Sequence, residues 1–178
     1  MILIDNNFNL FDYSEYSFFK DKCDDFKQSE RVIFYTEHGE NYYNRLSIDM
    51  FSEISKKIFK KIDKYVKNTL KSKKMYEFEI DIANVWINKI TSETNKTDDY
   101  HVDNRNVTFI LYLNDNFEGG EFQYIDDKGF EKILKPKKNL AIISNKKLKH
   151  RVLPVKSGER YSLVCFFNKK EKNNKTLY

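Results

Sequence analysis

The stretch His101–Gln123 reads HVDNRNVTFILYLNDNFEGGEFQ, and it decides how the second half of the chain folds. It opens with a histidine and an aspartate two residues apart, continues into an apolar run and ends on a double-glycine turn. On an extended backbone residues i and i+2 point to the same side, so His101 and Asp103 can face one metal ion. A chance pair in a polar surface loop is the competing interpretation of these two residues.

Histidine is scarce in this chain, so its positions are informative. The three copies are His38, His101 and His150, and the last two lie at the edges of predicted strands. Two imidazoles and one carboxylate form the facial triad that holds non-haem Fe(II) and leaves coordination positions open. His150, on a strand opposite His101 in a jelly roll, would complete such a triad. We expect His38 to be a surface loop residue.

The composition indicates a single folded domain over residues 1–178, with 40% hydrophobic and 16% aromatic residues. No apolar run is long enough to span a membrane, and the N-terminus lacks a signal-peptide pattern. Two cysteines are too few for a disulfide framework, and Cys165 in SLVCFF is expected to be a buried free thiol. We expect a cytoplasmic or otherwise intracellular protein, for which a viral or bacterial source is compatible. The oligomeric state is left open.

The formal net charge of +5 raises the question of nucleic-acid binding. Nearly all the basic residues are lysines, which favours a solvated surface over a phosphate-binding one. Nucleic acid therefore stays a secondary hypothesis for the partner, behind a protein, a peptide or a small molecule.

Hydrophobic spacing predicts a helix over residues 47–73, because apolar residues recur at helical spacing there and lysines fill the opposite face. Ser47 and Asp49 are the candidate N-caps. A short helix is also predicted within SEYSFFKDKCDDF near the N-terminus. From residue 75 the apolar residues alternate as in a strand, with a change of parity near Ala83 that indicates a bulge.

The remaining apolar runs are short and separated by turn signals such as NDNFEGG, DDKG and KSGE. They predict strands at Arg31–Thr36, Val107–Leu113, Glu121–Ile125, Phe130–Leu134, Leu140–Ile143, Arg151–Val155 and Tyr161–Phe167. The predicted class is α+β and mostly β, with a jelly-roll (double-stranded β-helix, cupin-like) core and N-terminal flanking helices. The core would span about residues 75–168, between a supporting segment 1–74 and a short polar tail 169–178.

Beyond single residues, two longer stretches resemble a known family. HVDNRNVTFILYLNDNFEGGEFQ has the His-x-Asp, the threonine-containing strand ending in Tyr-Leu-Asn and the Gly-Gly turn of 2-oxoglutarate-dependent Fe(II) oxygenases, particularly the prolyl hydroxylase group. LKPKKNLAIISNKKLKHRVLPVKSGERYSLVCFF is similar to the second half of the same core. The resemblance covers about residues 76–167, with its elements in the family's order.

The resemblance implies roles for six residues. His101, Asp103 and His150 would bind Fe(II). Arg160 would pair with the distal carboxylate of 2-oxoglutarate, which a planar guanidinium grips through two hydrogen bonds. Tyr112 and Ser162 would add hydroxyl groups to the same carboxylate. The competing interpretation of Arg160 is a salt bridge at the rim of the barrel.

Five further residues are candidates for contacting substrate or supporting the site, namely Trp86, Asn88, Tyr100, Arg105 and Thr108. Core packing is an equal interpretation for Trp86, and solvation is one for Arg105. The family's Tyr-x-Pro-Gly loop before His-x-Asp is missing, because the interval reads INKITSETNKTDDYHVD. Which residue replaces its tyrosine is open; Tyr100 adjoins the first ligand.

The resemblance thus implies an oxidoreductase, a dioxygenase that uses Fe(II), 2-oxoglutarate and O2, with ascorbate as a candidate reductant, and releases succinate and CO2. The first hypothesis for the substrate is a prolyl residue in a protein or peptide, as for a prolyl 4-hydroxylase. A hydroxylase of a free amino acid or other small metabolite is second, and a nucleic-acid demethylase is third. A non-catalytic jelly-roll binding module is the alternative of another class.

Overall fold

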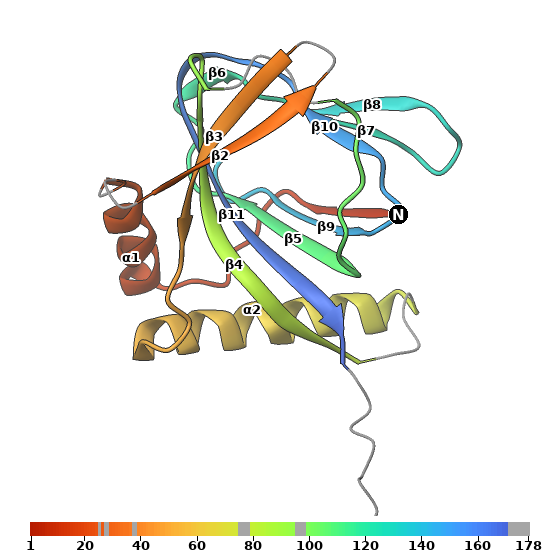
Figure 1. Ribbon diagram of the computed structural model, residues 1–178. Coiled ribbons are helices and arrows are strands. Elements are labelled where there is room, and N and C mark those ends of the chain that lie inside the picture. The colour runs from red at the N-terminus through yellow and green to blue at the C-terminus, as the bar shows by residue number, and fades with distance from the viewer. Residues whose placement is uncertain (25, 27–28, 37–38, 75–78, 95–98, 171–178) are drawn as a thin grey trace, which may run out of the picture.

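The computed structural model describes residues 1–24, 26, 29–36, 39–74, 79–94 and 99–170. Over these residues the protein is mostly β-structure, as the sequence predicts, with helices α1 (Tyr13–Asp24) and α2 (Glu53–Ser72) in its first half (Figure 1). His38, and with it the prediction that it is a loop residue, lies outside the described residues.

All the strands pair antiparallel with their neighbours, in two sheets. The major sheet has the order β1-β9-β5-β11-β4-β3-β2, with β6 paired to another part of β11, and the minor sheet has the order β10-β7-β8. The strands are β1 (Ile2–Asp5), β2 (Glu30–Thr36), β3 (Gly39–Ser47), β4 (Ile80–Thr91), β5 (Val107–Tyr112), β6 (Phe117–Gly119), β7 (Phe122–Ile125), β8 (Glu131–Leu134), β9 (Ala141–Asn145), β10 (His150–Val152) and β11 (Val155–Lys169).

Helix α2 begins later than the sequence predicts. Its N-cap is Ser52, whose hydroxyl accepts a hydrogen bond of 3.3 Å from the backbone N–H of Ser55. Ser47 cannot cap the helix because it ends β3, opposite Trp86 of β4. Asp49 instead accepts the N–H of Phe51 in the connecting turn. The apolar stripe of α2 packs on the major sheet through Ile58, Phe59, Ile62, Val66 and Leu70.

The side chains of strand β5 pack in two different clusters, one on each face of the major sheet. All six of its residues are buried, although they alternate between the two faces of the sheet. Val107, Phe109 and Leu111 belong to the large core that includes α2, whereas Ile110 and Tyr112 belong to a smaller cluster on the other face. The strand is therefore divided into a helix-facing and an interior-facing set of residues.

The predicted change of parity in β4 is a β-bulge at Ala83. Phe166 of β11 pairs with Asn84 and Phe167 with Ile82, so Ala83 is the extra residue. As a result Ile82 packs against the helix-side core, as Val85 and Ile87 do after the bulge. Tyr76 and Phe78, which were predicted to share this pattern, lie outside the described residues.

The sequence pattern missed β1, β3 and β6 and misjudged two boundaries. The predicted strand Arg151–Val155 is interrupted, because β10 ends at Val152 and β11 starts at Val155. β11 is also longer than its apolar stretch, because its first residues pair with β6 and its last ones with β4. None of the helices among the described residues is long and apolar enough to cross a membrane.

Candidate metal centre and its cavity

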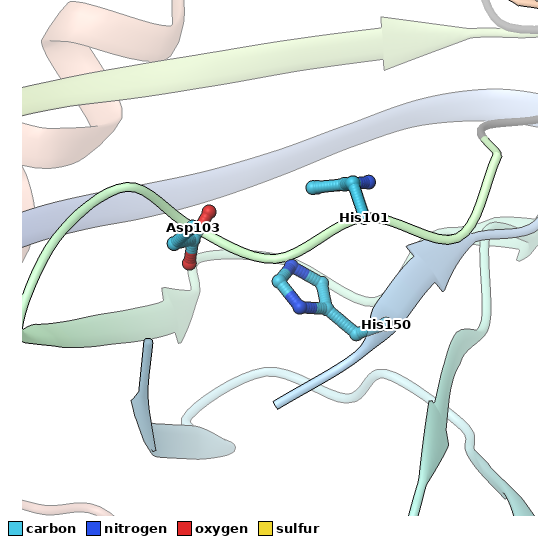
Figure 2. Close-up of side chains that lie close together, drawn as sticks. All are labelled: His101, Asp103 and His150. Atoms are coloured by element: carbon cyan, nitrogen blue, oxygen red, sulfur yellow. The ribbon is translucent and has the colours of Figure 1, made fainter. Parts of the chain in front are cut away.

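Three side chains from two segments meet at one end of the space between the sheets. His101 and Asp103 lie on the segment before β5, and His150 begins β10 (Figure 2). Each offers one nitrogen or oxygen atom, and these atoms all lie within 4.8 Å of one another. His101 and His150 form an isolated antiparallel bridge, with two N–H···O hydrogen bonds of 2.9 Å between their backbones. The backbone pairing therefore brings together two candidate ligands, His101 and His150, that lie in separate segments of the sequence.

The surroundings orient each of these side chains. Nδ1 of His101 lies 3.0 Å from the carbonyl oxygen of Asp99, and Nδ1 of His150 lies 3.0 Å from that of Leu148. A proton on Nδ1 is donated to the carbonyl in each case, which leaves the Nε2 lone pair for a metal. The buried Thr108 hydroxyl donates a hydrogen bond of 2.6 Å to Oδ2 of Asp103, so Oδ1 is left for a ligand.

Electrostatics favour the form of His150 that binds metal. Burial lowers the pKa of this imidazole, and the neighbouring His101 lowers it further, while Asp103 and the Leu148 carbonyl oppose the shift. A lowered pKa keeps His150 neutral near pH 7, and neutral imidazole is the form that coordinates a metal ion.

Arg160 lies deep between the sheets rather than at the rim. Its side chain is 2% exposed, and its Nη2 donates a hydrogen bond of 3.0 Å to the hydroxyl of Tyr112. Its Nε is buried without a hydrogen-bond partner, and no carboxylate of the described residues forms an ion pair with it. The rim salt bridge is therefore not formed. A buried guanidinium without a counter-charge is costly, which indicates a site for an anion.

The neighbours of Arg160 come from adjacent strands. Ser162 of β11 is buried and pairs across the sheet with Tyr112 on one side and Asn88 on the other. Gly120 allows the arginine stem to pass, because a Cβ at that position would lie 2.9 Å from Cδ of Arg160. The Gly-Gly turn thus shapes the arginine pocket as well as reversing the chain, which the sequence interpretation had not included.

A cavity of about 390 Å³ connects the metal-binding end with Arg160. Its walls are mainly apolar, with a few polar groups among them. The lining residues are Val32, Tyr43, Trp86, Asn88, Ile90, Asp99, His101, Asp103, Thr108, Ile110, Phe122, His150, Val152, Arg160, Ser162, Val164 and Phe166. The structure therefore brings eight of the eleven candidate residues to this wall, and Tyr112 contacts Arg160 beside it.

Two candidate residues point elsewhere. The hydroxyl of Tyr100 donates to Oε1 of Glu131 at 2.7 Å, and its ring lies 4.4 Å from the Arg151 guanidinium, so it does not line the cavity. Burial raises the pKa of Tyr100, and the hydrogen bond to Glu131 adds to this. Arg105 donates to Oδ1 of Asn84 at 3.4 Å and lines a neighbouring cavity.

The sequence interpretation missed the contribution of β2 and β3 to the cavity. Val32 and Tyr43 line it from these strands, and Phe122 stacks on the His150 ring with centroids 5.0 Å apart. The alternation in RVIFYT could have indicated Val32. Tyr43 carries no local signal, because β3 has no clear apolar alternation and is placed by its pairing with β4.

Comparison with known proteins agrees with this geometry. Residues 85–168 match the model of a family described as the 2OG-Fe(II) oxygenase superfamily. This segment contains the three candidate ligands, Arg160 and the strands between them. No curated protein matches the chain in sequence.

Solved structures share the fold at low sequence identity. An oxidoreductase of the 2OG-Fe(II) oxygenase family from Burkholderia pseudomallei superimposes with a TM-score of 0.74 at 18% identity, over 97% of this chain and 87% of its own. A Pseudomonas putida prolyl-4-hydroxylase gives 0.72 at 17% identity, over 96% and 93%. A Trichoplax adhaerens prolyl hydroxylase, in complex with a peptide fragment of the hypoxia inducible factor oxygen degradation domain, gives 0.71 at 16%, over 94% and 83%.

Proposed function

Because residues 85–168 of this chain match the 2OG-Fe(II) oxygenase superfamily, we propose that it hydroxylates a prolyl residue in a protein or peptide. As a 2-oxoglutarate-dependent dioxygenase it uses Fe(II), 2-oxoglutarate and O2. The observation that carries the proposal is the single cavity that joins the His101, Asp103 and His150 cluster to the buried Arg160. We take the two sheets as the halves of the double-stranded β-helix, with residues 75–168 as its core.

His101, Asp103 and His150 fit the iron. They supply two imidazole nitrogens and one carboxylate oxygen within 4.8 Å of one another, which is the donor set of the facial triad. Iron held by these three residues would, together with 2-oxoglutarate, supply the activation of O2 for oxidising a C–H bond of the substrate, with succinate and CO2 as co-products. The chain supplies the orientation of the ligands: two backbone carbonyls fix the imidazoles, and Thr108 fixes the carboxylate.

Arg160 fits the distal carboxylate of 2-oxoglutarate. Its buried Nε lacks an acceptor, and its Nη2 is already aligned by Tyr112. A carboxylate would accept from the guanidinium and from the hydroxyls of Tyr112 and Ser162, and would neutralise the buried charge. Asn88 adds a buried amide oxygen without a partner at the same wall; as an acceptor it would take a hydrogen bond from a donor group of a ligand rather than contact the carboxylate.

The apolar side chains that line the cavity fit a compact apolar group of the substrate. Val32, Ile90, Phe122, Val152 and Val164 line it together with Trp86 and Phe166, whose rings lie 4.8 Å apart. A pyrrolidine ring matches such walls, since its ring carbons form no hydrogen bonds. The Pseudomonas putida and Trichoplax adhaerens prolyl hydroxylases, which share the fold, add support for this class.

One spectroscopic experiment tests the cofactor assignment. The full chain with Fe(II) and 2-oxoglutarate, kept free of O2, should show a weak charge-transfer band in the visible. His150→Ala should remove the band, since one imidazole ligand is lost, while Tyr100→Phe, whose side chain lies outside the cavity, should keep it. Absence of the band in the wild type, or its persistence in His150→Ala, would contradict the assignment.

A product assay tests the substrate. Succinate release and the mass of one added oxygen should be measured with proline-containing peptides, free amino acids and methylated oligonucleotides. Oxygen added to the peptide prolyl residue supports the proposal. Turnover with free amino acids alone, or with oligonucleotides alone, overturns it in favour of a metabolite hydroxylase or a nucleic-acid demethylase. Binding without turnover of any of them would favour the non-catalytic module.

A further inference from the structure

A second cavity adjoins the metal-site cavity along β4, and it also has a volume of about 390 Å³. Trp86 lines both cavities. Asn88 and Ile90 line the first, and Asn84 lines the second, so the interior face of β4 runs from one to the other. An extended ligand whose reacting group lies beside His101 can therefore reach the second cavity by following this strand.

Two arginines face this second cavity, and none of the described residues that line it is acidic. Arg45 comes from β3, where its guanidinium lies 4.7 Å from the Trp86 ring. Arg105 comes from the segment after the His-x-Asp pair, and its Nη2 donates a hydrogen bond of 3.4 Å to Oδ1 of the neutral Asn84 amide. Glu30 pairs with Nη2 of Arg45 at 2.8 Å, but its own side chain is 62% exposed. Two cations and one anion leave a surplus of one positive charge.

The hydrogen-bonding capacity of this wall is not used up within the described residues. Nε of Arg45 is buried without an acceptor, and so is Nε1 of the Trp86 indole. Buried donors are nearly always paired in folded proteins, so two adjacent unpaired donors beside a cavity indicate that a ligand supplies the acceptor. The surplus of one charge matches a carboxylate rather than a phosphate monoester, whose charge is about −1.5 to −2 at neutral pH.

We propose that the second cavity binds a carboxylate of the substrate, held by Arg45 and Arg105, beside the group that is oxidised. The inference rests on the proposed function and narrows its substrate class. The carboxylate belongs either to an acidic side chain next to the reacting prolyl residue or to the substrate itself when that is a free amino acid. A guanidinium pair recognises both in the same way.

Trp86 provides a readout that does not depend on turnover, because it is the only tryptophan in the chain and lines both cavities. The full chain with Fe(II) and 2-oxoglutarate, free of O2, is titrated while its tryptophan fluorescence is recorded. The first ligand pair is the capped pentapeptide Ala-Glu-Pro-Glu-Ala and its Gln counterpart. The second is L-proline and L-prolinamide. A single-stranded oligonucleotide is the fifth ligand.

We expect the carboxylate member of at least one pair to bind about tenfold more tightly than its amide, the effect of one or two hydrogen bonds to a charged group. Arg45→Gln and Arg105→Gln should each reduce that ratio, and the double variant should bring it to one. Arg31→Gln is the matched control, because Arg31 stacks on Tyr42 of the neighbouring strand and lines neither cavity. It should keep the ratio.

Each outcome has a distinct meaning. A ratio near one in both pairs, or a preference that survives in the double variant, overturns the carboxylate site. The carboxylate site is also overturned if the oligonucleotide binds in a way that depends on Arg45 and Arg105 while neither the Glu pentapeptide nor L-proline does. A ratio near one in both pairs, together with hydroxylation of both pentapeptides, would leave the prolyl hydroxylase proposal standing while the carboxylate site falls. A preference confined to L-proline would support the site and contradict the peptide substrate.

Discussion

The two faces of the major sheet share strands but differ in what their polar atoms do. On the helix side Phe109, Leu111, Leu163 and Cys165 pack against α1 and α2, and Cys165 is a buried free thiol as predicted. On the cavity side the alternate residues of the same strands include Thr108, Tyr112, Arg160 and Ser162. Alternation along a strand therefore places core-packing side chains on one face of the sheet and the polar side chains of the cavity on the other.

The two faces also differ in how many buried polar atoms lack a hydrogen-bond partner. Among the described residues there are five, and four of them face the two cavities, on Arg45, Trp86, Asn88 and Arg160. The fifth is Oε1 of Glu15 between the helices, and Nζ of Lys57 lies 3.4 Å from it. The helix side satisfies its charges internally, whereas the cavity side leaves donors and acceptors for ligands. Substitutions on the two faces should consequently have different effects.

Arg160→Leu should have the largest effect on the cavity side. Loss of one partner of a buried charge pair costs about 2–5 kcal/mol, so the affinity for 2-oxoglutarate should fall about thirtyfold or more. Arg160→Lys keeps the charge but not the planar fork, and should lose less. The measurement is a titration of the visible band of the iron complex with 2-oxoglutarate in the absence of O2. Equal affinities in all three proteins would contradict the assignment of Arg160.

Thr108→Val should weaken iron binding while leaving the fold intact. The variant is nearly isosteric but removes the 2.6 Å hydrogen bond to Oδ2 of Asp103. Loss of such a supporting hydrogen bond typically lowers metal affinity by about 10–100-fold. Thr108→Ser retains the hydroxyl and should restore most of the affinity. Competition with a chelator measures this, and an unchanged Fe(II) affinity in Thr108→Val would show that the hydrogen bond does not support the metal site.

Gly120→Ala and Gly129→Ala form a matched pair with a smaller effect. Both glycines have positive φ, +65° and +84°, so alanine should cost each about 1–2 kcal/mol of stability. Only at Gly120 would the new Cβ crowd Cδ of Arg160, at 2.9 Å, because nothing lies within 4 Å of the corresponding position at Gly129. A several-fold loss of 2-oxoglutarate affinity is therefore expected in Gly120→Ala alone. If the two variants had equal affinity for 2-oxoglutarate, the Gly-Gly turn would not shape the pocket around Arg160.

The features of the fold that can be predicted from the sequence are those that a pattern of neighbouring residues indicates. The bulge at Ala83, the faces of β5 and the position of Cys165 follow from alternation, which a strand shows within a few residues. The candidate ligands and Arg160 were predicted from the resemblance of two longer stretches to the oxygenase family. Tyr43 and Arg45 were missed because β3 has no clear alternation and owes its place to pairing with β2 and β4. The second cavity, which needs β3, could not be predicted for the same reason.

Glu15→Gln should leave the cavity unchanged and affect stability alone. Glu15 is fully buried, and Oε2 accepts from Nζ of Lys61 and from the backbone N–H of Asp12, at 2.7 and 2.8 Å. Losing this buried charge should lower the free energy of unfolding by about 1–3 kcal/mol. Glu53→Gln is the control, since Glu53 pairs with Lys56 while 92% exposed, and should change stability by less than about 0.5 kcal/mol.

The pH dependence of this difference follows from the ionisation of Glu15. Burial by itself would raise the pKa of its carboxyl, but the Lys61 ion pair and the Asp12 hydrogen bond lower it overall below its ordinary 4.5. The stabilisation is then fully present above pH 4.5 and is lost as the pH falls through the lowered pKa. Wild type and Glu15→Gln should therefore differ most near neutral pH and converge in acid, in urea unfolding at several pH values. Reduced 2-oxoglutarate affinity in Glu15→Gln would show that the two faces of the sheet are coupled.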